Sequence, residues 1–221
     1  MNDNDTSIKT RRNNARNLAL VLALVAAAVF GVSIYQQSER QFAKGLGKFE
    51  KDREAFANLG GDFRLTTTRG ATSLSELWTN KVVLLYFGFT RCPDICPTSL
   101  AAMQAALGRL TPQERDQIQV VFVSADPEYD TPDRLQQYLE HFVTDSIGMT
   151  GDLDATLAAA KSYGAYFHKV ELPDSALGYT VDHSTRWYLI QKNGRIGTVF
   201  DHNLSPEQIA EILGVFARDA A

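Results

Sequence analysis

Two uninterrupted apolar runs constrain the fold most strongly: "KVVLLYF" at residues 81–87 and "IQVVFVS" at residues 118–124. Runs of this length, rich in β-branched residues and without polar alternation, are typical of strands buried on both faces of a sheet. Between them, in residues 98–110, apolar residues recur at helical spacing. The chain therefore alternates strands with helices, which predicts an α/β domain with a buried central sheet.

The last third of the chain completes this pattern. Strand-like runs occupy residues 165–170, 185–191 and 195–200, and an Asn-Gly pair between the last two favours a hairpin. A helix is predicted to begin at Ser205, where Ser-Pro-Glu-Gln combines a capping box with proline at the first helical position. The order of elements predicts a thioredoxin-like mixed sheet with helices on both faces, an extra N-terminal strand and an insertion near residues 144–164.

A membrane anchor is predicted near the N-terminus. Residues 18–34 contain no charged side chain and no proline, and about 17–25 such residues can cross a bilayer. The apolar run continues beyond the alanines at 26–28, which favours an uncleaved anchor over a cleaved signal peptide. Basic residues precede the run, so the N-terminus is expected to stay in the cytoplasm.

These features predict four parts. They are a cytoplasmic tail (1–17), a transmembrane anchor (18–35), a juxtamembrane stalk (36–59) and a folded domain (60–221). This topology places the protein in a bacterial inner membrane with its domain in the periplasm. The net charge of the whole chain is −4, and the part beyond the anchor is acidic without a basic stripe, which argues against a nucleic-acid partner.

The chain has only two cysteines, Cys92 and Cys96, in the sequence "RCPDICP" that directly follows the first buried strand. Pro93 and Pro97 stiffen this loop and favour a helix starting near Cys96, whose N-terminus would favour thiolate over thiol. In an oxidising periplasm such a pair forms a disulfide unless a reductant or a metal prevents it. Two thiolates do not complete a zinc site, but they suit Cu(I). The loop by itself leaves a structural disulfide, a redox couple and a soft-metal site open.

A third metal ligand would have to come from the four histidines. His141 lies on a predicted helix, His168 in a strand and His202 before the last helix, so structural or solvated roles are expected for these three. His183 differs, because it lies at the mouth of a strand beside Asp182, whose carboxylate could orient the ring. Spacing alone leaves its role open.

The segments "YFGFTRCPDICP", "VSADPEYDTPDRL", "GMTG" and "VDHSTRWYLI" resemble, in order and spacing, those of the Sco/SenC copper-binding proteins that assist assembly of cytochrome c oxidase. The resemblance covers about residues 60–221. It implies that Cys92, Cys96 and His183 bind one copper ion, as Cu(I) or Cu(II). It also implies a thioredoxin-like fold and, as client, the copper-bearing subunit of the oxidase. Another periplasmic copper carrier or a thiol reductase would be a further partner.

The chain departs from the family's commonest loop at Arg91, where histidine is usual. Arg91 is not an implied ligand, so the departure changes the charge at the rim of the loop and leaves the ligand set intact. The segment "DPEYD" at residues 126–130 also matches the family, and we expect it to form only a turn and a helix entry.

A periplasmic thiol–disulfide oxidoreductase that reduces a client's cysteines is the main alternative. Against it, three residues separate the cysteines instead of the usual two, and Asp182, His183 and Ser184 stand where thioredoxins place a cis-proline. A purely structural domain with a stapling disulfide would leave His183 unexplained. We therefore favour a membrane-anchored copper metallochaperone over an enzyme, and thiol–disulfide exchange stays open as a second activity.

Overall fold

The computed structural model describes residues 22, 24–33, 36–37, 49–173, 175 and 177–220. The chain divides into two compact units, Met1–Gly47 and Lys48–Ala221. In the first unit the described residues are helical and exposed. Within the described part of the chain, no helix is both long enough and apolar enough to cross a membrane. The predicted tail 1–17 and much of the predicted anchor lie outside the described residues.

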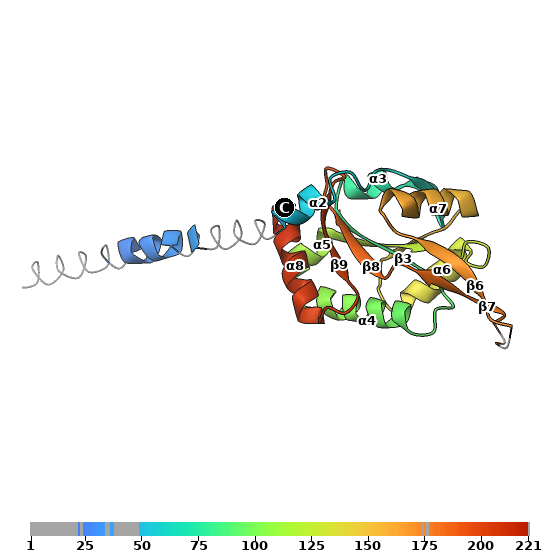
Figure 1. The fold of residues 1–221 in the computed structure, drawn as a ribbon. Helices are drawn as coiled ribbons and strands as arrows, with labels where there is room; N and C mark the ends of the chain where they lie inside the picture. The colour runs from blue at the N-terminus through green and yellow to red at the C-terminus, as the bar shows by residue number, and fades with distance from the viewer. Residues whose placement is uncertain are drawn as a thin grey trace, which may run out of the picture. The chain divides into compact units, whose positions relative to one another are not determined.

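The second unit is built on a five-stranded mixed sheet with the order β5-β4-β3-β8-β9 (Figure 1). Its strands are β3 (Val82–Gly88), β4 (Ile118–Ser124), β5 (Ile147–Met149), β8 (Arg186–Ile190) and β9 (Ile196–Asp201). β3 and β5 run parallel to β4, whereas β8 is antiparallel to both β3 and β9. The mixed sheet predicted from the sequence is confirmed. Every residue of β3 is buried, as its unbroken apolar run indicates.

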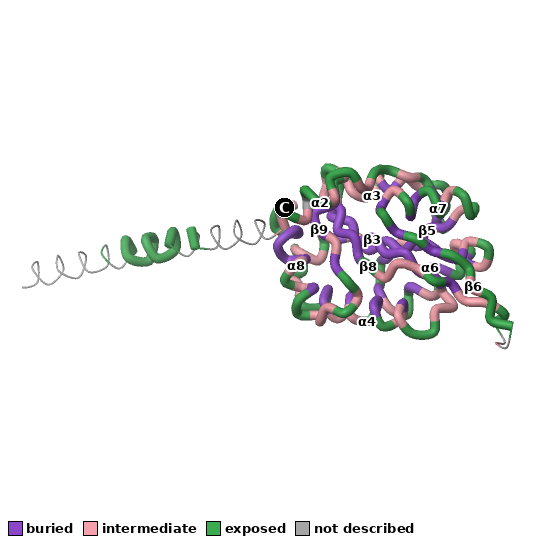
Figure 2. Tube along the Cα trace, in the orientation of Figure 1, coloured by how far each residue is buried: buried purple, intermediate pink, exposed green. Residues whose placement is uncertain are grey.

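Helices cover both faces of this sheet (Figure 1). They are α2 (Glu50–Ala55), α3 (Leu74–Trp78), α4 (Ile95–Leu107), α5 (Pro112–Asp116), α6 (Pro132–Glu140), α7 (Leu153–Ser162) and α8 (Pro206–Asp219). Thr131 and Ser205 directly precede α6 and α8, and their hydroxyls accept capping hydrogen bonds. The cap at Ser205 is the one that the sequence predicts. The buried residues concentrate along the central strands (Figure 2).

Two short antiparallel ribbons flank the main sheet. β1 (Arg64–Thr67) pairs with β2 (Gly70–Ser73), and β6 (Phe167–Glu171) pairs with β7 (Tyr179–His183). The sequence indicated β1 and β6 but not their partners, because β2 and β7 are short and mix apolar with polar residues. The expected insertion at 144–164 contributes the edge strand β5 and helix α7.

The segment 49–59, predicted as part of a stalk, packs against the folded domain. The Thr198 hydroxyl on β9 donates a hydrogen bond of 2.7 Å to the Asp52 carboxylate on α2. The rings of Phe49 and Phe216 lie 5.1 Å apart between their centroids. Part of the segment assigned to the stalk therefore contacts the folded domain.

Candidate metal centre

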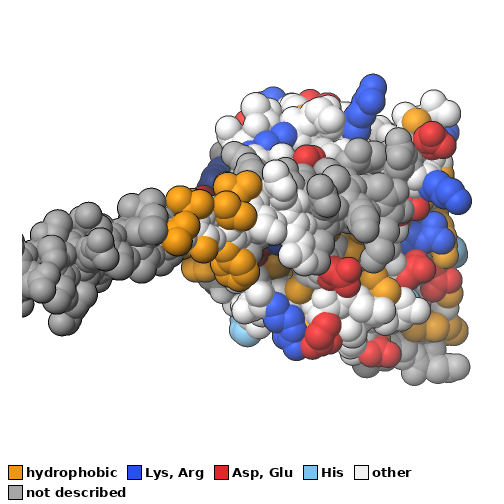
Figure 3. Space-filling view, turned by 90° about the vertical axis from the view of Figure 1, so that its left-hand side faces the viewer, with side chains coloured by type: hydrophobic (Ala, Val, Ile, Leu, Met, Phe, Trp, Pro, Cys, Tyr) orange, Lys and Arg blue, Asp and Glu red, His pale blue; other side chains and the backbone are white. Residues whose placement is uncertain are grey.

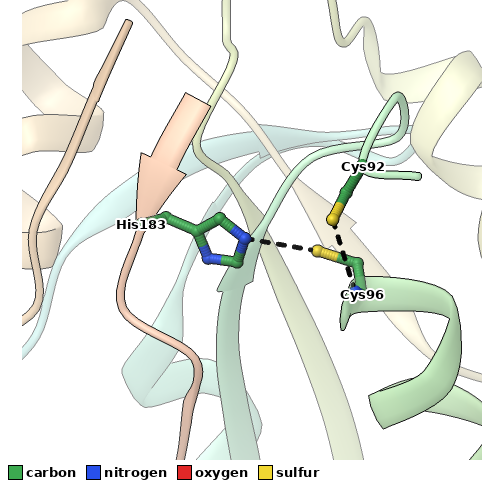
Figure 4. Close-up of side chains that lie close together, drawn as sticks. All are labelled: Cys92, Cys96 and His183. Carbon is green, nitrogen blue, oxygen red and sulfur yellow. Dashed lines mark hydrogen bonds between the residues drawn. The ribbon is translucent and has the colours of Figure 1, made fainter. Parts of the chain in front are cut away.

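The loop between β3 and α4 carries both cysteines. Cys92 lies in the loop and is half-buried, whereas Cys96 is the second residue of α4 and is fully buried. The Cys96 backbone N–H donates to Cys92 Sγ over 3.4 Å (Figure 4). Because Cys96 lies in the first turn of the helix, its amide has no partner within the helix and is free to stabilise a thiolate at Cys92.

His183 reaches the cysteines from the end of β7. Its Nε2 lies 3.5 Å from Cys96 Sγ (Figure 4). Its Nδ1 lies 2.9 Å from the carbonyl oxygen of Ser184. A carbonyl can only accept a hydrogen bond, so Nδ1 carries the hydrogen and Nε2 keeps a free lone pair. The imidazole packs edge-on against the rings of Phe89 and Tyr86. Backbone and aromatic contacts thus fix which nitrogen faces the sulfur.

The carboxylate that the sequence suggested as the orienting group of His183 has another partner. Successive side chains of a strand point to opposite faces, so Asp182 points away from His183. Asp182 is exposed, and its carboxylate lies 3.7 Å from His168 Nε2 on the neighbouring strand β6. The interpretation of Asp182 as the orienting group was therefore wrong, and the Ser184 carbonyl takes that place.

The other histidines lie apart from the cysteines. His141 ends α6, where its Nδ1 contacts the Gln137 carbonyl, and His168 is exposed. Among the described residues, the one group of three or more potential metal ligands is formed by Cys92, Cys96 and His183. The structure thus brings together the three residues named from the sequence, although 87 positions separate Cys96 from His183.

The two thiols differ in acidity. Hydrogen bonding, first from the Cys96 side chain and then from backbone amides, lowers the pKa of Cys92 to about 4 despite its partial burial. Burial raises the pKa of Cys96 above that of an ordinary thiol, and the nearby Cys92 sulfur adds to this effect. In the absence of a metal, Cys92 is a thiolate at neutral pH and Cys96 is its hydrogen-bond donor.

The three donor atoms are close enough to share one ion. The two sulfurs and an imidazole nitrogen lie within 4.8 Å of one another. Donors bound to one ion through bonds of about 2.0–2.3 Å lie at most about 4.6 Å apart, so little movement is needed to bring them together. Two thiolates and one imidazole form a soft donor set that fits Cu(I), and the set can accept a further ligand for Cu(II).

The segment 126–130 has a role that the sequence analysis missed. The buried Asp130 carboxylate accepts hydrogen bonds from the Thr90 backbone N–H at 3.1 Å and from the Ser124 hydroxyl at 2.8 Å. Asp126 is also buried and forms an ion pair with Arg91. These two carboxylates fasten the beginning of the cysteine loop to the end of β4. The sequence did contain a signal for this contact. Two consecutive parallel strands end at the same edge of a sheet, so the acidic residues after β4 could have been expected near the cysteine loop after β3.

The fold and the site together define a thioredoxin-like domain whose cysteine loop faces a histidine from a separate ribbon. The family model SCO1/SenC matches residues 51–217, and the chain belongs to this family. An SCO2-like protein of Rickettsia felis is 32% identical over 204 residues, covering 91% of this chain and 97% of the relative.

Solved structures agree with this assignment. Copper-bound ScoI of Bradyrhizobium japonicum matches with 35% identity and a TM-score of 0.63, covering 72% of this chain and 99% of that one. Copper-bound ScoI of Arabidopsis thaliana matches with 31% identity and a TM-score of 0.65, covering 73% and 99%. Both neighbours hold the metal that suits the donor set described above.

Proposed function

We propose that this protein is a membrane-anchored copper metallochaperone. It binds one copper ion through Cys92, Cys96 and His183 and delivers it to the copper site of cytochrome c oxidase during assembly. The observation that carries the proposal is the convergence of two cysteine sulfurs and an imidazole nitrogen within 4.8 Å, in a chain of the SCO1/SenC family. Copper-bound relatives with the same fold support the choice of metal.

The arrangement suits a site that releases its cargo. One thiol is half-buried in a loop, and the imidazole comes from a different ribbon, so an incoming ligand from a client has a route to the ion. Because Cys92 is already a thiolate, it loses no proton when it binds a cation. Delivery to the copper-bearing subunit of the oxidase is the role that family membership supports, and the predicted anchor with its basic flank is the reason to place this role in a bacterial periplasm.

Thiol–disulfide exchange is the second candidate function. The half-buried Cys92, with its pKa of about 4, has the properties of an attacking thiolate, and the buried Cys96 those of a resolving thiol. In that reaction the Cys92 thiolate attacks one sulfur of a client disulfide. The client S–S bond breaks, a mixed disulfide forms, and the other client sulfur leaves as a thiolate that takes the proton of Cys96. The Cys96 thiolate then attacks Cys92 Sγ, which forms the Cys92–Cys96 disulfide and releases the client's second sulfur as a thiolate.

A copper titration tests the metallochaperone proposal. We expect the reduced full chain in detergent to bind one equivalent of Cu(I) and of Cu(II). Replacing any one ligand by alanine should lower the affinity at least tenfold. His141→Ala is the matched control, because that imidazole lies on α6 and contacts its own helix. The proposal fails if the ligand variants bind copper as tightly as the wild-type chain. Insulin reduction at enzyme-like rates would favour the second candidate.

A further inference from the structure

Arg91 directly precedes Cys92, and its guanidinium reaches a buried carboxylate. Its Nη2 lies 3.1 Å from Asp126 Oδ2, and the side chains of Arg91 and Asp126 are only 19% and 1% exposed. An ion pair at this depth is strongly coupled, because removing one partner leaves an uncompensated charge in the interior. Arg91 therefore joins the cysteine loop to the turn that follows β4.

The same guanidinium is held between two aromatic rings. It lies 4.0 Å from the ring centroid of Tyr129, in the turn, and 4.3 Å from that of Tyr179, on β7. Stacking of this kind is selective for arginine, whose planar group can contact ring faces while its N–H groups bond to a carboxylate. The Tyr179 hydroxyl also donates to Asp126, at 2.9 Å from Oδ2. Arg91, Asp126, Tyr129 and Tyr179 thus form one connected group, which we call the Arg91 clamp.

Strand β7 carries both a member of the clamp and a metal ligand. Tyr179 begins the strand and His183 ends it. Residues at even separations along a strand share a face, so both side chains point toward the body of the domain. Among the described strands, β7 pairs only with β6, so hydrogen bonds to the main sheet do not hold it in place.

We propose that Arg91 is a positioning residue for the metal centre. By binding Asp126 and Tyr179 at once, it ties the ribbon β6–β7 to the cysteine loop and sets the distance between His183 and the two sulfurs. The identity of the metal rests on the proposed function. The contacts of Arg91 with Asp126 and Tyr179 are present in the metal-free structure. The ligand pair Cys92 and Cys96 would keep its own geometry without the clamp, because the loop and α4 hold it.

Hydrogen exchange on the reduced, metal-free full chain tests the geometric part. Arg91→Gln should increase the exchange rate of the β7 amides about tenfold or more, because the ribbon loses its link to the cysteine loop and keeps only its other contacts, such as those of Phe167 and Val181 in the core. Arg134→Gln is the matched control: its guanidinium lies 4.4 Å from the same Tyr129 ring, but its hydrogen bond goes to the Tyr129 carbonyl instead of to Asp126. Equal exchange in the wild type and Arg91→Gln would overturn the proposal.

A double-mutant cycle tests the consequence for the metal. Arg91→Gln should weaken Cu(II) binding about tenfold or more in the wild-type chain, the size expected for a residue that orients a ligand. In the His183→Ala background it should weaken binding less than about twofold, because the ligand that it positions is already gone. Equal losses in both backgrounds would mean that Arg91 acts on the whole domain and would overturn the proposal.

Tyr179→Phe provides the same test if Arg91→Gln fails to fold. It removes one hydroxyl from Asp126 and keeps the ring that stacks on Arg91. The β7 amides should exchange faster than in the wild type, by a smaller factor than in Arg91→Gln. Cu(II) affinity should fall by a smaller factor as well, and only while His183 is present. No change in either measurement would contradict the clamp. A wild-type chain that fails to bind copper would contradict the proposed function, and the exchange measurements would still decide the role of Arg91.

Discussion

Cys92 and Cys96 have the same side chain, but their surroundings shift the two thiol pKa values in opposite directions. Cys92 accepts hydrogen bonds at the exposed end of a helix, and its pKa falls to about 4. Cys96 is enclosed by the core, and burial raises its pKa. This asymmetry suits both proposed activities, since a preformed thiolate binds a soft cation and attacks a disulfide.

The pH dependence of alkylation tests this assignment. The thiolate is the nucleophile, and it persists at every pH above the pKa of the group. Alkylation of Cys92 by iodoacetamide in the reduced, metal-free protein should therefore stay constant from pH 8 to about pH 5 and decline as the pH approaches about 4.

Two variants control the alkylation experiment. Cys92→Ala should remove nearly all fast labelling, because Cys96 is buried. Cys96→Ala should move the decline to higher pH, because the hydrogen bond from the Cys96 side chain is the main effect that lowers the pKa of Cys92. A labelling midpoint between pH 8 and 9 in the wild type, the ordinary range for a thiol, would contradict the assignment.

The end of β3 approaches α4 very closely at Gly88. A Cβ placed there would lie 2.7 Å from Phe122 Cζ and 2.8 Å from Cys96 Sγ. A glycine is therefore required at the last position of β3 if the cysteine loop and α4 are to pack this closely against the strand. The same glycine lets the Cys96 sulfur sit against the strand.

Gly88→Ala should consequently affect stability and the site together. We expect the free energy of unfolding to fall by about 1–3 kcal/mol, the usual cost of an overpacked core, and copper affinity to fall because Cys96 is displaced. Gly108→Ala is the control, because a Cβ there meets its nearest neighbour at 3.5 Å and the backbone is right-handed helical. Urea unfolding of both variants measures the difference, and equal stabilities would refute this account of Gly88.

The chain as a whole combines a compact acidic domain with an apolar N-terminal segment. In the helical residues of that segment, several large apolar side chains are exposed: Leu22, Leu24, Val25, Val29, Phe30 and Val32. Figure 3 shows such side chains gathered on the described part of the segment. A helix that is apolar all around is the kind that a membrane or a protein interior covers, which supports the proposed anchor over 18–35.

Fractionation of cells that express the full chain tests the anchor. The protein should sediment with membranes and resist a carbonate wash, and a variant that lacks residues 18–35 should not. Alkaline phosphatase fused to the C-terminus should be active, because that enzyme matures only after export and the basic residues before the anchor hold the N-terminus in the cytoplasm. A full chain that remains in the soluble fraction would contradict the proposed topology.

Local sequence patterns were sufficient to predict the strands and helix caps that depend only on neighbouring residues. The strand predicted at 118–124 is β4 with the same bounds, because a doubly buried strand has an unbroken apolar run. Ser205 caps its helix as predicted, because a cap depends on neighbours a few residues away. Strand β7 was not predicted, because among the described strands it pairs only with the short strand β6, and Tyr179 is half-buried by residues far along the chain.

The sequence by itself determined the α/β class and the cysteine pair, and through its resemblance to a family it named His183 as the candidate third ligand. Only the tertiary structure decided that the Ser184 carbonyl orients His183 while Asp182 points to the opposite face. It also decided that Arg91 and Asp126 meet across 35 positions to join the cysteine loop to the turn that follows β4. The physical reason is the sequence distance over which each interaction acts. Strand and cap signals arise from adjacent residues, whereas the partner of a buried charge depends on which distant chain segments the sheet brings together.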